Sequence, residues 1–159
     1  TPPALVEALS ARKAAAVQHA AAAGDLIIAA DTVVALDGRV LGKPADGPDA
    51  FAMLSALSGR RHQVYTGLTV VCGAQRLTEH EVTAVTFRSL SSAEICAYIA
   101  TGEPMDKAGA YGIQGRGALF VEGIEGDYYN VMGLPVASLR RRLLSMGVLS
   151  LPKVDKKDC

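Results

Sequence analysis

An aspartate directly after an apolar run is the clearest chemical signal in the sequence. The run Leu26-Ile27-Ile28-Ala29-Ala30 is unbroken, and Asp31 follows it. Open α/β sheets place ligands at the carboxyl ends of their strands, so a carboxylate there could activate a water molecule or hold a divalent cation. The adjacent Thr32 adds a hydroxyl group. The alternative is that Asp31 only starts a turn or caps a neighbouring element, and position alone does not separate the two interpretations.

Three lysines lie near glycine, proline and carboxylate residues, and these are candidate phosphate ligands. They are Lys13, Lys43 in Leu41-Gly42-Lys43-Pro44, and Lys107 next to Asp106 in the segment 103–109. An ammonium group binds phosphate as a point charge. A single lysine is more often a solvated surface charge, so the three together favour a phosphate site only modestly.

A glycine-rich segment, Gly112-Ile113-Gln114-Gly115-Arg116-Gly117, carries one side-chain amide. Its glycine spacing does not match the dinucleotide-binding fingerprint, and a strand is predicted after it where that fingerprint needs a helix. The Gln114 amide has both donors and an acceptor, which suit the edge of a nucleotide base. The alternative is a surface turn with a solvated amide.

The elements that must position these residues follow from hydrophobic patterning and capping signals, and they predict a single α/β unit. Asp37-Gly38 is a strong hairpin signal, Asp46 is a helix N-cap, and Ser91 with Glu94 forms a capping box. The strand 26–30 has no polar residue, so we expect it to be buried on both faces. The predicted helices are 1–23, 46–59, 91–102 and 134–146, and the predicted strands are 26–30, 31–36, 39–41, 62–72, 77–87 and 118–124.

Length and charge limit the class of protein. The 159 residues suit one domain, which we place at 1–150, followed by a polar tail at 151–159. Lys+Arg and Asp+Glu are equal at 16 each, which argues against a nucleic-acid-binding face and against a polybasic membrane anchor. No segment is long and apolar enough to span a membrane. The three cysteines contain no Cys-x-x-Cys pair, which predicts free thiols in the cytoplasm.

A series of short motifs extends from about Lys13 to Pro135. They are Ala30-Asp31-Thr32-Val33-Val34, Leu41-Gly42-Lys43-Pro44, Met53-Leu54-Ser55 with Leu57-Ser58-Gly59 and His62, Gly102-Glu103-Pro104, Asp106-Lys107-Ala108-Gly109-Ala110-Tyr111-Gly112-Ile113-Gln114-Gly115, and Asn130-Val131 with Gly133-Leu134-Pro135. Taken together, they resemble the Maf family of nucleoside triphosphate pyrophosphatases. The matches recur in the family's order, which makes the series far more specific than any one motif.

The resemblance implies a two-lobed α/β fold of the Maf and inosine-triphosphatase-like kind, with a curved mixed sheet flanked by helices and the nucleotide in a cleft between the lobes. It implies hydrolysis of dTTP or UTP to the monophosphate and pyrophosphate, with Mg²⁺ or Mn²⁺ as cofactor. By the same resemblance Asp31 is the proton acceptor and could hold the metal, and Lys13 and Lys43 are active-site lysines. Thr32 and Gln114 set base preference, and Asp106 and Lys107 are further substrate-binding candidates. A homodimer is also expected.

The resemblance also shows a difference. The family begins with a strand and a Ser-x-Ser-Pro-Arg-Arg loop that binds phosphates, and an acidic loop follows; neither is in these 159 residues. Because the chain opens Thr1-Pro2-Pro3 without methionine, we expect it to lack the family's first strand and phosphate loop. A non-catalytic nucleotide-binding regulator of cell division is therefore the alternative function, and a purely structural domain is a weaker third one.

Overall fold

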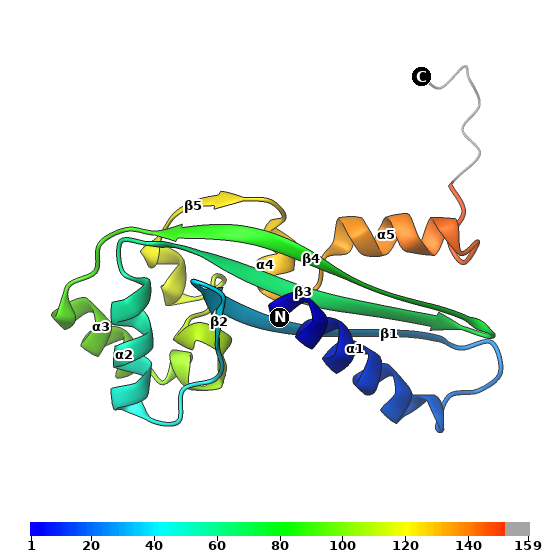
Figure 1. The fold of residues 1–159 in the computed structure, drawn as a ribbon, viewed down its shortest axis with the longest axis horizontal. Helices are drawn as coiled ribbons and strands as arrows, with labels where there is room; N and C mark the ends of the chain where they lie inside the picture. Colours follow the sequence, from blue (N-terminus) through cyan, green and yellow to red (C-terminus); the bar gives the residue numbers. More distant parts are fainter. Residues whose placement is uncertain (152–159) are drawn as a thin grey trace, which may run out of the picture.

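The computed structural model describes residues 1–151, which form one open sheet with helices on both faces (Figure 1). The strand order is β2-β1-β3-β4-β5, and every pairing in this part of the chain is antiparallel. The predicted α/β class, a sheet flanked by helices, is confirmed, but the sheet within residues 1–151 is antiparallel and not mixed as expected. The strands are β1 (Leu26–Leu36), β2 (Arg39–Leu41), β3 (Arg61–Cys72), β4 (Gln75–Phe87) and β5 (Val121–Glu125). The α-helices are α1 (Pro2–Gln18), α2 (Gly47–Leu57), α3 (Ser92–Ile99), α4 (Tyr128–Met132) and α5 (Val136–Ser145).

The main apolar core lies on one face of the sheet. β1, β3 and β4 contribute β-branched and aromatic side chains, and α2, α3 and the segment 103–120 pack against them (Figure 1). Phe87 lies at the centre, with edge-to-face contacts to three rings. The buried members are Val34, Leu36, Ala50, Leu54, Leu57, Val64, Val85, Phe87, Ile95, Tyr98, Ala110, Tyr111, Ile113 and Phe120.

Helix α1 covers the opposite face, against β1 and β3. The Ser10 and Thr69 hydroxyl groups are 2.9 Å apart and both are fully buried, which ties the helix to β3. One turn away the helix backbone at Val6 lies directly on Gly67, and a Cβ at that position would overlap the Val6 carbonyl. A glycine in the middle of a strand therefore permits the close approach of the helix.

The strand β1 continues through Asp31, which corrects the prediction that Asp31 follows the end of a strand. Asp31 is paired with Gly67 in the centre of the β1–β3 ladder. The prediction that this strand is buried on both faces is also wrong, because Leu26 and Ile28 are 38% and 39% exposed. The reason is that Leu26 and Ile28 lie on the face of the main core, which packs on β1 only at the other end of the strand, at Val34 and Leu36. In addition, β2 pairs only with the end of β1, from Val34 to Leu36, so within residues 1–151 the edge of β1 before Val34 is open.

Local signals predicted most boundaries well. The Asp37-Gly38 hairpin, the Asp46 cap, the Ser91–Glu94 capping box and the strands predicted at 62–72 and 77–87 are all confirmed; these two strands are β3 and β4, which form an antiparallel hairpin. The first helix ends at Gln18 and not at residue 23, and the predicted strand 118–124 starts with a 3-10 turn, Arg116–Phe120. The predicted helix 134–146 is α5, and the short helix α4 before it was not predicted.

Three expectations concern the chain as a whole. No helix in residues 1–151 is long and apolar enough to cross a membrane. Cys72 and Cys96 carry free thiols, as expected. Cys159 and all of the predicted polar tail except Leu151 lie outside the described residues.

The contact between α1 and β3 predicts that Gly67→Ala destabilises the protein. The added methyl group must push α1 away from the sheet, and overpacking of this kind costs about 1–3 kcal/mol. Urea unfolding followed by circular dichroism measures the change. Gly123→Ala is the matched control, because Gly123 is also in a strand and a Cβ there meets nothing within 4 Å. Equal stability of the two variants would contradict the prediction.

Candidate active site

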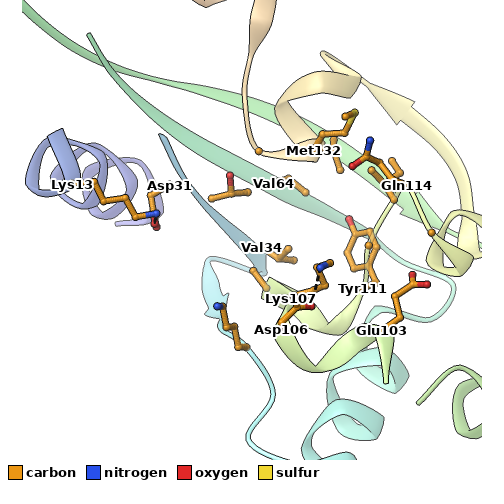
Figure 2. Close-up of a pocket in the computed structure, with 18 residues that line it drawn as sticks. Lys13, Asp31, Val34, Val64, Glu103, Asp106, Lys107, Tyr111, Gln114 and Met132 are labelled. Carbon is orange, nitrogen blue, oxygen red and sulfur yellow. Dashed lines mark hydrogen bonds and ion pairs between the residues drawn. The ribbon is translucent and has the colours of Figure 1, made fainter. Parts of the chain in front are cut away.

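A cleft of about 630 Å³ opens beside the edge of β1, and its volume is typical of small-molecule sites. It brings together all seven residues singled out from the sequence, although they come from positions spread over a hundred residues. Lys13 and Asp31 lie on one side of it, and Gln114, Tyr111 and Glu103 lie on the other (Figure 2). The seven are Lys13, Asp31, Thr32, Lys43, Asp106, Lys107 and Gln114.

The open edge of β1 explains how two consecutive residues reach the same cleft. Successive side chains of a strand point to opposite faces. Asp31 belongs to the face covered by α1, and Thr32 belongs to the face that carries the main core. At this point β1 pairs with β3 along one edge only, and within residues 1–151 no strand pairs with its other edge, so the cleft wraps around that edge and is lined by both residues.

Asp31 is held by an ion pair. The Lys13 ammonium contacts Asp31 Oδ1 and also donates a hydrogen bond of 3.1 Å to the carbonyl of Ala30. The Asp31 side chain is 19% exposed, so a water molecule or a ligand can reach it. Lys13 therefore fixes the direction of the carboxylate without closing it off.

The charges in the cleft are balanced. Three lysines line it, and so do three carboxylates, those of Asp31, Glu103 and Asp106. Lys107 Nζ donates a 2.7 Å hydrogen bond to Asp106 Oδ1; this bond lowers the pKa of Asp106, and the positive charge of Lys43 adds to the effect. A polyphosphate would therefore need additional positive charge in order to bind tightly.

The carboxylates are suitable partners for such a charge. Mg²⁺ is commonly bound by one or two carboxylates together with substrate phosphates and water. Asp31 meets this requirement, because the ion pair with Lys13 occupies Oδ1 and leaves Oδ2. Residues 1–151 contain no group of three or more His, Cys, Asp or Glu side chains that could hold a metal ion.

The loop that carries Gln114 is fastened at both ends by one pair of side chains. Tyr98 accepts a hydrogen bond from the Gly112 backbone N–H at 3.1 Å and donates one of 2.8 Å to Glu103. Glu103 in turn accepts from the backbone N–H groups of Arg116 and Gly117, at 2.9 and 3.1 Å. The Gln114 side chain is exposed, but its backbone is fixed on either side.

The surroundings of this pair shift both of its pKa values. Partial burial opposes ionisation of Glu103, but the two backbone N–H groups and the Tyr98 hydroxyl outweigh it and lower the pKa of Glu103. Burial is also the main cause that raises the pKa of Tyr98. Tyr98 is therefore a neutral donor beside an ionised acceptor, which makes their hydrogen bond charge-assisted.

His62 lies in the core next to Tyr111, a residue that lines the cleft. It is fully buried, and its Nε2 lies 2.8 Å from the hydroxyl of Tyr111, which lines the cleft. Burial lowers the pKa of His62 to about 4, so the ring is neutral near pH 7. His62 is thus a core residue and contacts the cleft only through Tyr111.

Sequence reasoning did not single out several residues of the cleft. Glu103 and Tyr111 appeared only as letters within motifs, and Met132 and Gly133 come from α4 and its C-terminal turn, which were not predicted. A signal for Glu103 existed: a glutamate before proline, close to a glycine-rich loop whose N–H groups need an acceptor. No comparable local signal points to Tyr111.

Fold and cleft together define an α/β protein with a site for a small, charged ligand beside a side-chain amide. The family model for Maf-like proteins matches residues 1–146, and the chain belongs to this family. It is 56% identical over 150 residues to the dTTP/UTP pyrophosphatase of Moorella thermoacetica, a match that covers 92% of the chain and 76% of the relative. The dTTP/UTP pyrophosphatase of Carboxydothermus hydrogenoformans is 58% identical over 124 residues, 77% of the chain and 67% of the relative. The dTTP/UTP pyrophosphatase of Symbiobacterium thermophilum is 52% identical over 147 residues, which cover 92% of the chain and 75% of the relative.

The fastened loop predicts a local effect of Glu103→Ala. Without the carboxylate the N–H groups of Arg116 and Gly117 lose their acceptor, so their hydrogen exchange at neutral pH should accelerate at least about tenfold. Exchange monitored by NMR spectroscopy tests this, and the Val70 amide in β3 is the internal reference. Lowering the pH of the wild-type protein slows the intrinsic exchange of every amide, but the protection factors of the Arg116 and Gly117 amides should fall relative to that of Val70 as Glu103 is protonated. The lowered pKa means that the contribution of Glu103 is complete above about 4.5 and is lost as the pH falls through its folded-state value. Unchanged exchange of both amides in the variant would show that Glu103 does not hold the loop.

Proposed function

We propose that this protein is a nucleoside triphosphate pyrophosphatase that hydrolyses dTTP and UTP to the monophosphate and pyrophosphate. One observation carries the proposal: a carboxylate, three lysines, a hydroxyl and an amide from distant segments line one cleft of nucleotide size. The names of three relatives that are 52–58% identical support the same activity.

In the proposed reaction Asp31 is the general base. The water oxygen forms a bond to the α-phosphorus while the bond from that phosphorus to the oxygen bridging to the β-phosphorus breaks, and the water proton passes to Asp31. A carboxylate within hydrogen-bond reach of the water is required, and the partial exposure of Asp31 allows this. Lys13 orients the carboxylate, and Lys43 and Lys107 neutralise phosphate oxygens as the charge on the leaving pyrophosphate grows.

The cofactor in this proposal is Mg²⁺ or Mn²⁺. Asp106, together with substrate phosphate oxygens, would hold the cation, with Asp31 as a further carboxylate in the cleft. When bound, the cation supplies positive charge that stabilises the phosphate oxygens. The equal numbers of lysines and carboxylates in the cleft support this requirement, because the lysines alone leave no excess positive charge there.

Base preference is assigned to Gln114 and Thr32. The Gln114 amide can pair with the O4 and N3 edge of a pyrimidine, and both side chains line the cleft. A site whose polar groups remain unpaired with the wrong base discriminates strongly. A homodimer and a cytoplasmic location stay predictions from the sequence.

Asp31→Asn tests the general base. We expect kcat for dTTP and UTP to fall by about 10²–10⁴-fold, because an amide cannot accept the water proton. Pyrophosphate release by the protein as its gene encodes it, with Mg²⁺ or Mn²⁺, is the measurement. The matched control is Asp37→Asn, in the hairpin turn at the end of the same strand, where the carboxylate pairs with Arg60 on the surface. Turnover by Asp31→Asn equal to that of this control would remove Asp31 from the role of base.

Removal of the cation tests the charge balance. EDTA should abolish pyrophosphate release, and added Mg²⁺ or Mn²⁺ should restore it. Calorimetry with UTP should show weaker binding in EDTA, because the lysines are already compensated by carboxylates. Full activity in EDTA would contradict the cation requirement. Nucleotide binding without any product, with the cation present, would instead favour a non-catalytic regulator.

A further inference from the structure

A chain of hydroxyl groups runs from the cleft into the interior. Thr32 Oγ1 in β1 lies 2.8 Å from Thr66 Oγ1 in β3, its directly paired neighbour. Thr66 Oγ1 donates a 2.9 Å hydrogen bond to the backbone carbonyl of Asn130 in α4. Thr32 lines the cleft, whereas Thr66 and Asn130 are fully buried.

The direction of this chain is fixed by its last member. A carbonyl oxygen can only accept, and a hydroxyl group has a single proton. Thr66 uses its proton on Asn130, so the hydrogen bond between the two threonines must be donated by Thr32. The proton of Thr32 therefore points to Thr66, and what Thr32 offers to a ligand in the cleft is a lone pair.

The carbonyl that fixes the direction is itself held firmly. The Asn130 side-chain amide donates to the Val64 carbonyl at 3.1 Å and to Thr83 Oγ1 at 2.9 Å. The backbone N–H of Gly133 donates to the same Asn130 carbonyl at 3.0 Å. With these contacts Asn130 cannot turn its carbonyl away, so the orientation of the Thr32 hydroxyl is built into the fold.

A hydroxyl group that can only accept a hydrogen bond can distinguish uracil and thymine from cytosine, whereas an amide alone cannot. Uracil and thymine present an N3–H donor beside the O4 acceptor, whereas cytosine presents an N3 acceptor beside an amino donor. A glutamine amide pairs with the first pattern in one orientation and with the second after a half-turn of the amide. Gln114 alone therefore cannot separate UTP from CTP.

We propose that Thr66 is a specificity-positioning residue: it holds the Thr32 hydroxyl as an acceptor for the N3–H of uracil or thymine, and so disfavours cytosine. This inference rests on the proposed function, which assigns a pyrimidine nucleotide to the cleft. Adenine also lacks the imino proton and is therefore disfavoured by the Thr32 hydroxyl as well. Thymine and uracil differ only at C5, so the Thr32 hydroxyl does not distinguish between them.

Thr66→Val removes the hydroxyl with little change of shape and releases the Thr32 proton. The ratio of kcat/KM for UTP to that for CTP should fall about tenfold or more, because Thr32 can then turn and donate to cytosine N3. Thr66→Ser should keep the wild-type ratio. Thr86→Val, on the neighbouring strand and outside the cleft, controls for the loss of a strand threonine. A ratio unchanged in a folded Thr66→Val protein would overturn the proposal, and so would a wild-type protein that does not distinguish UTP from CTP.

Binding measurements separate this inference from the proposed activity. Non-hydrolysable α,β-imido analogues of UTP and CTP, and of 3-methyluridine triphosphate, are titrated into the wild-type protein by calorimetry. The proposal expects the uridine analogue to bind at least tenfold more tightly than the other two, even if no nucleotide is hydrolysed. Equal binding of the uridine and cytidine analogues would overturn it. Selective binding of the uridine analogue without turnover would support the role of the hydroxyl chain and contradict only the proposed hydrolysis. If Thr66→Val does not fold, the comparison with the 3-methyl analogue still tests whether the base N3–H is recognised.

Discussion

The distance between α1 and the sheet is the constraint on which the rest of the site depends. Because Gly67 has no side chain, the backbone of α1 at Val6 rests directly on β3. Gly67 is also the residue paired with Asp31, so the same close contact sets the height of the helix above the carboxylate. From that height Lys13 reaches both Asp31 and the carbonyl of Ala30. If the helix lay further from the sheet, Lys13 could not reach Asp31, and the carboxylate would lie at the edge of β1 without its ion-pair partner.

The cleft illustrates how a protein of zero net charge can serve an anionic ligand. Two of its three lysines, Lys13 and Lys107, are already paired with the carboxylates of Asp31 and Asp106. Ion pairs between partly exposed groups contribute little to stability, so in the proposed reaction Lys107 could exchange the Asp106 carboxylate for a phosphate partner at little cost. In the absence of a ligand these ion pairs fix the positions of the Lys13 and Lys107 ammonium groups at the cleft.

What could be read from the sequence was local, and what could not was the way distant segments meet. The Asp37-Gly38 turn and the Ser91–Glu94 cap depend on residues a few positions apart, and both were predicted correctly. Asp31 was singled out for a wrong structural reason, because the apolar run before it looked like a complete strand and the ladder to β3 that continues it is non-local. The hydroxyl chain from Thr32 to Asn130 spans almost a hundred residues, and no spacing rule could have revealed it.

The crowding around the Gln114 loop limits how the specificity of this cleft can change. A Cβ at Gly115 would overlap the Glu103 carboxylate, and one at Gly117 would lie 2.6 Å from the Gly112 carbonyl. A side chain at Gly117 would therefore require the loop backbone to move, and one at Gly115 would require the Glu103 carboxylate to leave the backbone N–H groups that it holds. If Gln114 contacts the base as proposed, a new base preference in this part of the cleft would therefore arise more readily by replacement of the side chain at position 114 than by a change in the shape of the loop.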